Sequence, residues 1–80
     1  MTPITAQANI LDVLNFQEKT ASKNNLKKEI SKLKQEVIAL FQKAEIGLSQ
    51  IKKQLKNMIL QSNLYNGAKQ KIVKFLDKMK

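Results

Sequence analysis

An apolar stripe through the middle of the chain constrains the fold most. At 100° per residue, large or small apolar side chains between residues 26 and 59 fall within about 60° of one line along a helix. The stripe comprises Leu26, Ile30, Leu33, Val37, Leu40, Phe41, Ala44, Leu48, Ile51, Leu55, Met58 and Ile59. This pattern predicts helical structure with one continuous face for packing.

The stripe repeats every 18 residues, so that Leu26 maps onto Ala44 and Leu40 onto Met58. Eighteen residues make five turns, whereas a strict heptad repeat would drift and impose a left-handed supercoil. We therefore expect one nearly straight helix over residues 25–62, roughly 55 Å long. Gly47 is the obvious place for a hairpin, but the stripe keeps its phase there and no Pro, Asn or Asp accompanies it. Gly47 either admits a close helix or is a tolerated surface glycine.

Two shorter helices flank the stripe. Thr2 followed by Pro3 predicts a capped helix over residues 3–19. Its apolar face comprises Ala6, Ile10, Leu11, Val13 and Leu14. Polar residues at 20–25 predict a turn, with Asn25 as the next N-cap. The pair Asn66-Gly67 predicts a second turn and a third helix over residues 67–79. The apolar face of that helix comprises Ala68, Ile72, Phe75, Leu76 and Met79, with Tyr65 in line before it.

The expected fold is all-α, a single small domain over residues 1–80 with three helices. The long central helix carries a shorter helix folded back at each end, as a coiled-coil-like helical bundle. The first helix would cover residues 26–41 and the third residues 48–59 through short loops. Two alternatives stay open, a kinked continuation of the central helix into the third and a partly open helix that pairs with a second copy.

Phe16 lies off the apolar face of the first helix, beside Asn9. We expect it to fold under the following turn; the alternative is an exposed anchor for a partner. A chain of 80 residues has a thin core in this arrangement. Leftover apolar surface would then be available to another chain.

The composition argues against an enzyme. The chain has no His and no Cys, only six carboxylates, and two glycines. It therefore lacks a convergent acid, base or nucleophile, an ordinary zinc site and a glycine-rich phosphate loop. We expect no cofactor and no metal.

Positive charge is concentrated toward the C-terminus. Residues 46–80 carry eight lysines against Asp77 alone, which accounts for +7 of the net charge of +9. Such a field favours an acidic protein, a nucleic acid or an anionic membrane. The basic surface comprises Lys52, Lys53, Lys56, Lys69, Lys71, Lys74 and Lys78. There is no arginine for base-specific contacts, so nucleic-acid binding would be independent of sequence.

The function predicted from these features is a non-enzymatic protein-binding module, such as an assembly component, a chaperone-like adaptor or a small inhibitor. Its partner is another protein or a second copy of the chain, in a homo-oligomer. The predicted partner-binding residues lie on the stripe, at Leu33, Val37, Leu40, Leu48, Ile51, Leu55 and Met58. Nucleic-acid binding through the lysines is the alternative, and an amphipathic membrane-surface helix over residues 67–80 comes third. The apolar runs are short and no signal pattern opens the chain, so we expect a cytoplasmic protein, with signal-less export not excluded.

Overall fold

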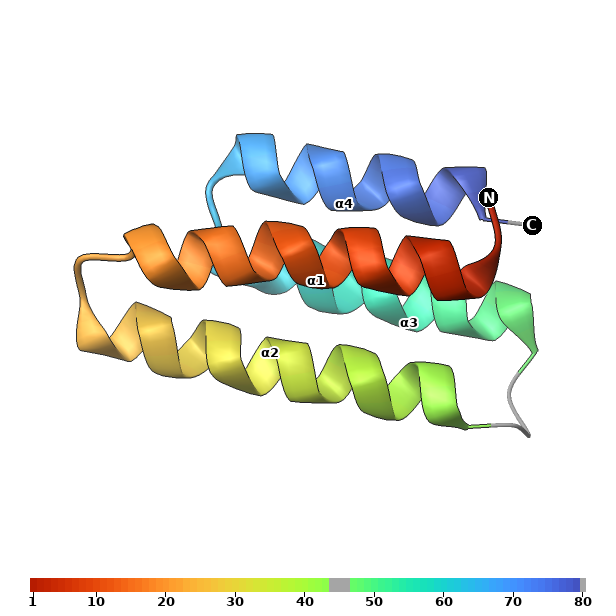
Figure 1. Cartoon of the computed structure of the whole chain (residues 1–80), viewed down its shortest axis with the longest axis horizontal. Coiled ribbons are helices and arrows are strands. Elements are labelled where there is room, and N and C mark those ends of the chain that lie inside the picture. Colours follow the sequence, from red (N-terminus) through yellow and green to blue (C-terminus); the bar gives the residue numbers. More distant parts are fainter. Residues whose placement is uncertain (44–46, 80) are drawn as a thin grey trace.

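Four helices make up the described part of the chain, residues 1–43 and 47–79, in the computed structural model (Figure 1). They are α1 (Pro3–Thr20), α2 (Asn24–Gln42), α3 (Leu48–Gln61) and α4 (Asn66–Lys78). The all-α class is confirmed. The expected three-helix arrangement is wrong, because two helices occupy the region where one long helix was predicted.

The chain leaves the helical conformation between α2 and α3, although the apolar stripe continues in phase through this region. Lys43 leaves the helical conformation at φ −78° and ψ 99°, and Gly47 is extended at φ −68° and ψ 160° before α3 begins. Helix α3 then runs antiparallel to α2 (Figure 1). Helical periodicity reports which side chains share a face but not whether the axis continues, so the same stripe fits two helices that fold onto one core. Ala44, the stripe position between them, lies outside the described residues.

Gly47 does not provide a close helix approach. A Cβ atom placed there would have no heavy atom of another element within 4 Å, and its φ is negative. The surface interpretation of this glycine therefore holds in the monomer.

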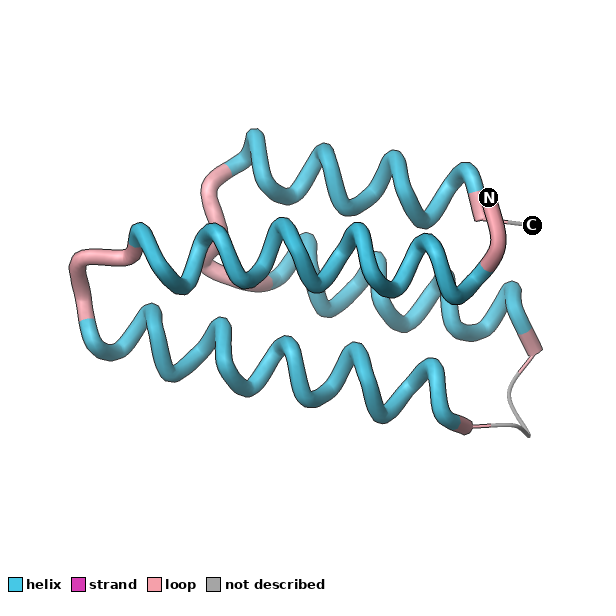
Figure 2. The backbone as a smooth tube through the Cα atoms, in the orientation of Figure 1, coloured by secondary structure: helices cyan, strands magenta, loops and turns pink. Residues whose placement is uncertain are grey.

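The four helices run up and down in chain order. The connections after α1 and α3 lie at one end of the bundle, while the end of α2, the start of α3, the N-terminus and the end of α4 lie at the other (Figure 2). Helix α1 packs against α2 and α4, helix α3 packs against α4, and α2 and α3 pack together least extensively of these neighbouring pairs. The bundle measures 35 × 21 × 19 Å along its principal axes.

One core fills the space between the helices. Each helix contributes side chains spaced three or four residues apart, as expected for an inward-facing helical stripe. The buried set comprises Ala6, Ile10, Leu14, Ile30, Leu33, Val37, Leu40, Ile51, Leu55, Ile59, Leu64, Ala68, Ile72, Leu76 and Met79. No polar or charged side chain of the described residues is buried with them.

Local contacts set the helix ends. The Thr2 hydroxyl accepts a hydrogen bond from the Thr5 N–H at 3.2 Å, as the sequence predicts for an N-cap. The predicted cap at Asn25 is wrong, because α2 already begins at Asn24 and its N-cap residue, Lys23, makes no side-chain cap. The Met1 amino group donates to the Lys78 carbonyl at 3.2 Å and thereby joins the two ends of the chain.

Glu29 ties the first turns of α2 to the connection between α3 and α4. Its Oε2 accepts from the Asn63 backbone N–H and its Oε1 from the Asn63 side-chain amide, both at 2.8 Å. This two-point contact spans 34 residues of sequence. It holds the ends of α2 and α3 together although their helical bodies are the least extensively packed neighbours.

Removing this contact should weaken the bundle measurably. We expect Glu29→Ala to lower the free energy of unfolding by about 1 kcal/mol, the usual value for a hydrogen bond to a partly exposed charged group. Urea titration followed by circular dichroism at 222 nm measures the change. Glu36→Ala is the matched control, because Glu36 lies two turns later on α2 and makes none of the hydrogen bonds or ion pairs found among the described residues. Equal losses in both variants would contradict a specific role for Glu29.

Candidate protein-binding surface

The residues predicted to bind a partner lie mainly in the core. Leu33, Val37, Leu40, Ile51 and Leu55 are at most 7% exposed. Leu48 and Met58 are half-buried and pack against the core. The stripe is thus covered by the chain itself, and a partner would reach most of it only if the bundle opened.

A shallow hollow between α2 and α3 gives partial access to two of these residues. Leu33 and Met58 line it together with Glu29, Glu36 and Lys32, and it encloses about 200 Å³. Its rim carries both signs of charge, so it shows no preference for a charged partner.

The predicted basic residues come together on α3 and α4. These two helices hold Lys52, Lys53, Lys56, Lys69, Lys71, Lys74 and Lys78 against Asp77 alone, a net charge of +6. Asp77 is already paired with Lys56. Lys69 lies between the helices and donates through its Nζ to the Leu60 carbonyl at 3.1 Å.

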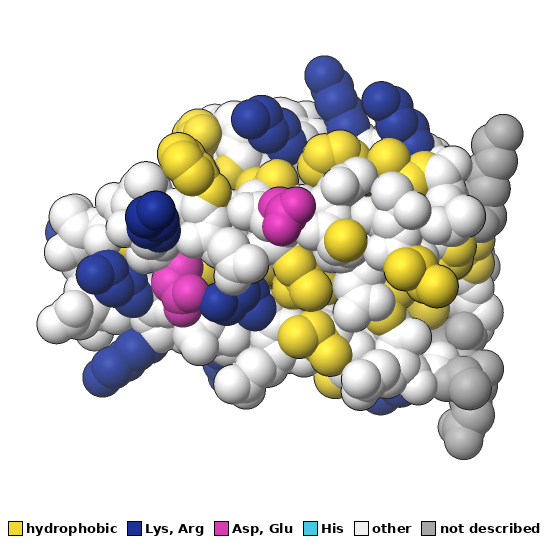
Figure 3. All heavy atoms as spheres, viewed as in Figure 1, with side chains coloured by type: hydrophobic (Ala, Val, Ile, Leu, Met, Phe, Trp, Pro, Cys, Tyr) yellow, Lys and Arg dark blue, Asp and Glu magenta, His cyan; other side chains and the backbone are white. Residues whose placement is uncertain are grey.

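Three of these lysines form a row on the side of α4 that faces α1. Lys71 lines the hollow between α1 and α4, and Lys74 and Lys78 follow it by three and seven residues, which places them on the same side of the helix. All three are exposed and make no ion pair within the described residues. In Figure 3, basic side chains gather along the edge of the molecule formed by α4.

Two aromatic side chains are exposed at one end of this face. Phe16 on α1 is 61% exposed, so the expectation that it folds under the turn is wrong. Tyr65, expected in line with the core, is 59% exposed as the residue that precedes α4. Phe41 and Phe75 instead pack partly buried against the core. The off-face phase of Phe16 was visible in the sequence, whereas Tyr65 lies just outside a helix and its direction was not.

A hollow of about 230 Å³ lies between these aromatics. Its lining comprises Asp12, Val13, Phe16, Gln17, Tyr65, Ala68 and Lys71. The two helices supply an apolar floor, because Val13 is half-buried and Ala68 is 1% exposed. The α1–α4 face therefore combines exposed aromatics, an apolar hollow and a lysine row.

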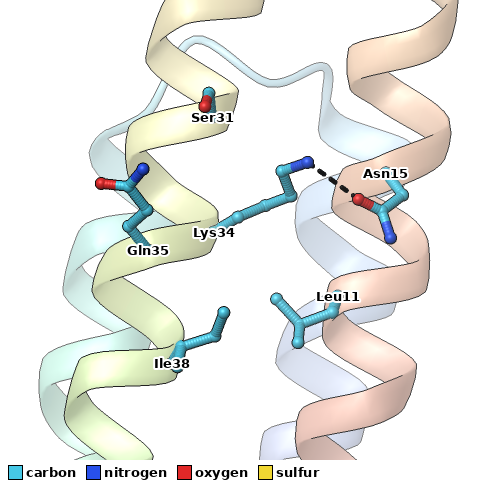
Figure 4. Close-up of a pocket in the computed structure, with 6 residues that line it drawn as sticks. All are labelled: Leu11, Asn15, Ser31, Lys34, Gln35 and Ile38. Atoms are coloured by element: carbon cyan, nitrogen blue, oxygen red, sulfur yellow. Dashed lines mark hydrogen bonds between the residues drawn. The ribbon is translucent and has the colours of Figure 1, made fainter.

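A larger hollow of about 340 Å³ lies between α1 and α2 (Figure 4). Lys34 crosses it and donates through its Nζ to Asn15 Oδ1 at 2.9 Å and to Glu18 Oε1 at 2.6 Å. Leu11 and Ile38 extend toward each other farther along the seam (Figure 4). Since the charged group in this hollow is already paired, we interpret it as a bridge between two helices and not as a ligand site.

Neither a metal site nor a membrane span is found in the described residues. No group of three or more Asp or Glu side chains there is arranged to hold a metal ion. None of α1 to α4 combines the length and the apolar character needed to cross a bilayer.

Comparison of the chain with models of protein families, with curated proteins and with solved structures yields no match. What the chain does is therefore inferred from its own residues and their geometry.

Proposed function

We propose that this chain is a non-enzymatic protein-binding module whose basic half, α3 and α4, binds an acidic partner. The division of charge carries the proposal. Helices α3 and α4 hold a net +6, whereas α1 and α2 hold Lys19, Lys27, Lys28, Lys32 and Lys34 against Asp12, Glu18, Glu29 and Glu36, a net +1. A one-sided field of this kind steers acidic partners toward one face.

The pairing of charges within the bundle supports the same proposal. Lys34 and Lys56 are the lysines that form ion pairs within the described residues, with Glu18 and Asp77 respectively. The lysine row of Lys71, Lys74 and Lys78 is left for contacts outside the chain. Partial burial of exposed charge pairs by a partner strengthens their attraction, since the surrounding dielectric falls.

A comparison of two triple variants tests the proposal. Lys71, Lys74 and Lys78 are changed to Gln in one, and Lys23, Lys27 and Lys28, all exposed near the start of α2, in the other. Each variant loses three charges. In a nuclease-treated pull-down from host lysate, the α4 variant should lose a discrete acidic protein that the wild type and the α2 variant retain. Equal losses would show that total charge alone matters and would refute a defined surface.

Nucleic-acid binding is the second candidate, because seven lysines on neighbouring helices supply a phosphate-binding field. It predicts binding of a single-stranded DNA oligonucleotide that weakens steeply between 50 and 200 mM salt, as counterion release requires. Fluorescence anisotropy at the two salt concentrations distinguishes this candidate. The sequence also predicts a cytoplasmic location and self-association, and both remain part of the proposal that the chain is a protein-binding module.

A further inference from the structure

The hollow between α1 and α4 is where the apolar and basic features of the surface meet. Phe16 and Tyr65 stand at its rim, and Lys71 lines it. Exposed aromatic side chains contribute large contact areas to protein interfaces at little conformational cost. Because neither ring is needed to fill the core, their joint exposure beside an apolar floor indicates a contact with another molecule.

The ring of Tyr65 has a defined place on this surface. A Cβ atom added at Gly67 would lie 2.5 Å from Tyr65 Cε2, so the ring lies directly over this glycine. The absence of a side chain at residue 67 thus lets the ring rest against the first turn of α4. A ring held this way presents one wall of the hollow.

The volume of the hollow indicates what enters it. Pockets for small molecules commonly enclose about 300 to 1,000 Å³ and bury most of the ligand. At about 230 Å³ this hollow is smaller. It suits a single large apolar side chain that projects from a partner.

The charges beside the hollow indicate the rest of the partner. Lys71, Lys74 and Lys78 follow one side of α4 over about 10 Å, at 1.5 Å per residue. Carboxylates on successive turns of another helix have a matching spacing. We propose that the hollow binds an acidic amphipathic helix, which inserts one large apolar side chain between Phe16 and Tyr65 and places its carboxylates along the lysine row.

Asp12 favours such a helix over a nucleic acid. Its exposed carboxylate lies in the lining of the hollow, on the α1 side. A nucleic-acid strand carries a phosphate at every nucleotide and would bring one close to Asp12 wherever a base stacked on the aromatics. A helical segment can place its apolar residue at Asp12 and its acids only along α4.

The inference depends on the proposed function, because it names the partner of the same basic half. The probe is a fluorescein-labelled helical peptide with one Leu followed by Glu three, seven and ten residues later. A peptide of the same composition in scrambled order is its control. Fluorescence anisotropy against the full chain gives the Kd of each.

Two exposed side chains are replaced for the test, in Phe16→Ser and Tyr65→Ser, and Leu60→Ser is the matched control. Leu60 is 49% exposed but lies on α3, away from the hollow. Each aromatic variant should raise the Kd about tenfold, as loss of an interface anchor does, while Leu60→Ser leaves it unchanged. Gly67→Ala should also weaken binding, because its methyl group displaces the Tyr65 ring while the aromatic stays present.

The outcomes separate the inference from the proposed function. If the Lys71, Lys74 and Lys78 triple variant weakens peptide binding but the aromatic variants do not, binding of an acidic partner is supported and insertion of a side chain into the hollow is refuted. If none of them weakens binding, both are refuted. Equal affinity for the scrambled peptide, or no binding of the ordered one, refutes the helical occupant. Tighter, Phe16-dependent binding of single-stranded DNA or phosphatidylserine vesicles would overturn it in favour of those ligands.

Discussion

Replacing Leu55 by Ala should remove a large part of the stability of the bundle. Leu55 is 1% exposed and lies in the middle of α3. Truncating a fully buried leucine costs about 2 to 5 kcal/mol, through lost apolar burial and the cavity left behind. The free energy of unfolding of a small domain is about 5 to 15 kcal/mol. If this bundle lies near the lower value, the single change removes most of its stability. Urea unfolding followed by circular dichroism measures the loss.

Leu60→Ala is the matched control for this prediction. Leu60 lies on the same helix and is 49% exposed, so the same chemical change there should alter the free energy of unfolding by no more than about 0.5 kcal/mol. The contrast depends on the fold. In an open, continuous helix both leucines would be solvated, and two small losses of similar size would therefore contradict the four-helix core.

The helical class and the core residues of α1 and α4 were predictable from the sequence. The apolar spacing identified Ile10 and Leu14 in α1, and Ile72 and Leu76 in α4, as core residues, and all four are buried. A break between α3 and α4 was predictable because Asn66 and Gly67 are strong turn formers, but its position was wrong: the connection comprises residues 62–65, and Asn66 and Gly67 are the first residues of α4. These features are local, and local pattern is what a single sequence reports best.

The reversal between α2 and α3 was not predictable from the same pattern. Leu40 and Ile51 are 11 residues apart, which is close to three helical turns, so the stripe continues in phase whether or not the chain reverses. The reversal is favoured by the amount of apolar surface that the whole chain buries, which a local pattern does not report. A straight helix leaves a thin core between two layers, whereas four shorter stripes that face one another bury the same side chains together.

The difference between one straight helix and two helices that face the same core also explains why core residues were predicted to form a binding surface. Leu33 and Leu55 were assigned to a partner because two short helices on one long helix were expected to form only a thin core and to leave apolar surface uncovered. Once α2 and α3 face the same core as α1 and α4, those side chains are enclosed. The remaining apolar exposure lies outside the buried set, at Phe16, which is off the face of α1, and at Tyr65, which precedes α4.

A distance measurement should distinguish the two arrangements by tens of ångströms. Spin labels attached through cysteines at Lys28 and Gln61, both exposed, report the separation between the start of α2 and the end of α3. The chain has no native Cys, so both labels are unique. In one continuous helix the 33 residues between them would span about 50 Å. In the bundle, Glu29 contacts Asn63 at 2.8 Å, and double electron–electron resonance should give a distance well below the 35 Å long axis.

Labels at Lys28 and Gln42 provide an internal reference distance for this measurement. Both residues lie on α2, and the 14 residues between them span about 21 Å in either arrangement. Dilution with unlabelled chain removes distances between copies, so that a short distance between Lys28 and Gln61 arises within one molecule. A distance near 50 Å would restore the continuous helix and expose the stripe to a partner. A short distance would place Leu33 and Leu55 inside the bundle and leave the α1–α4 face as the surface for binding.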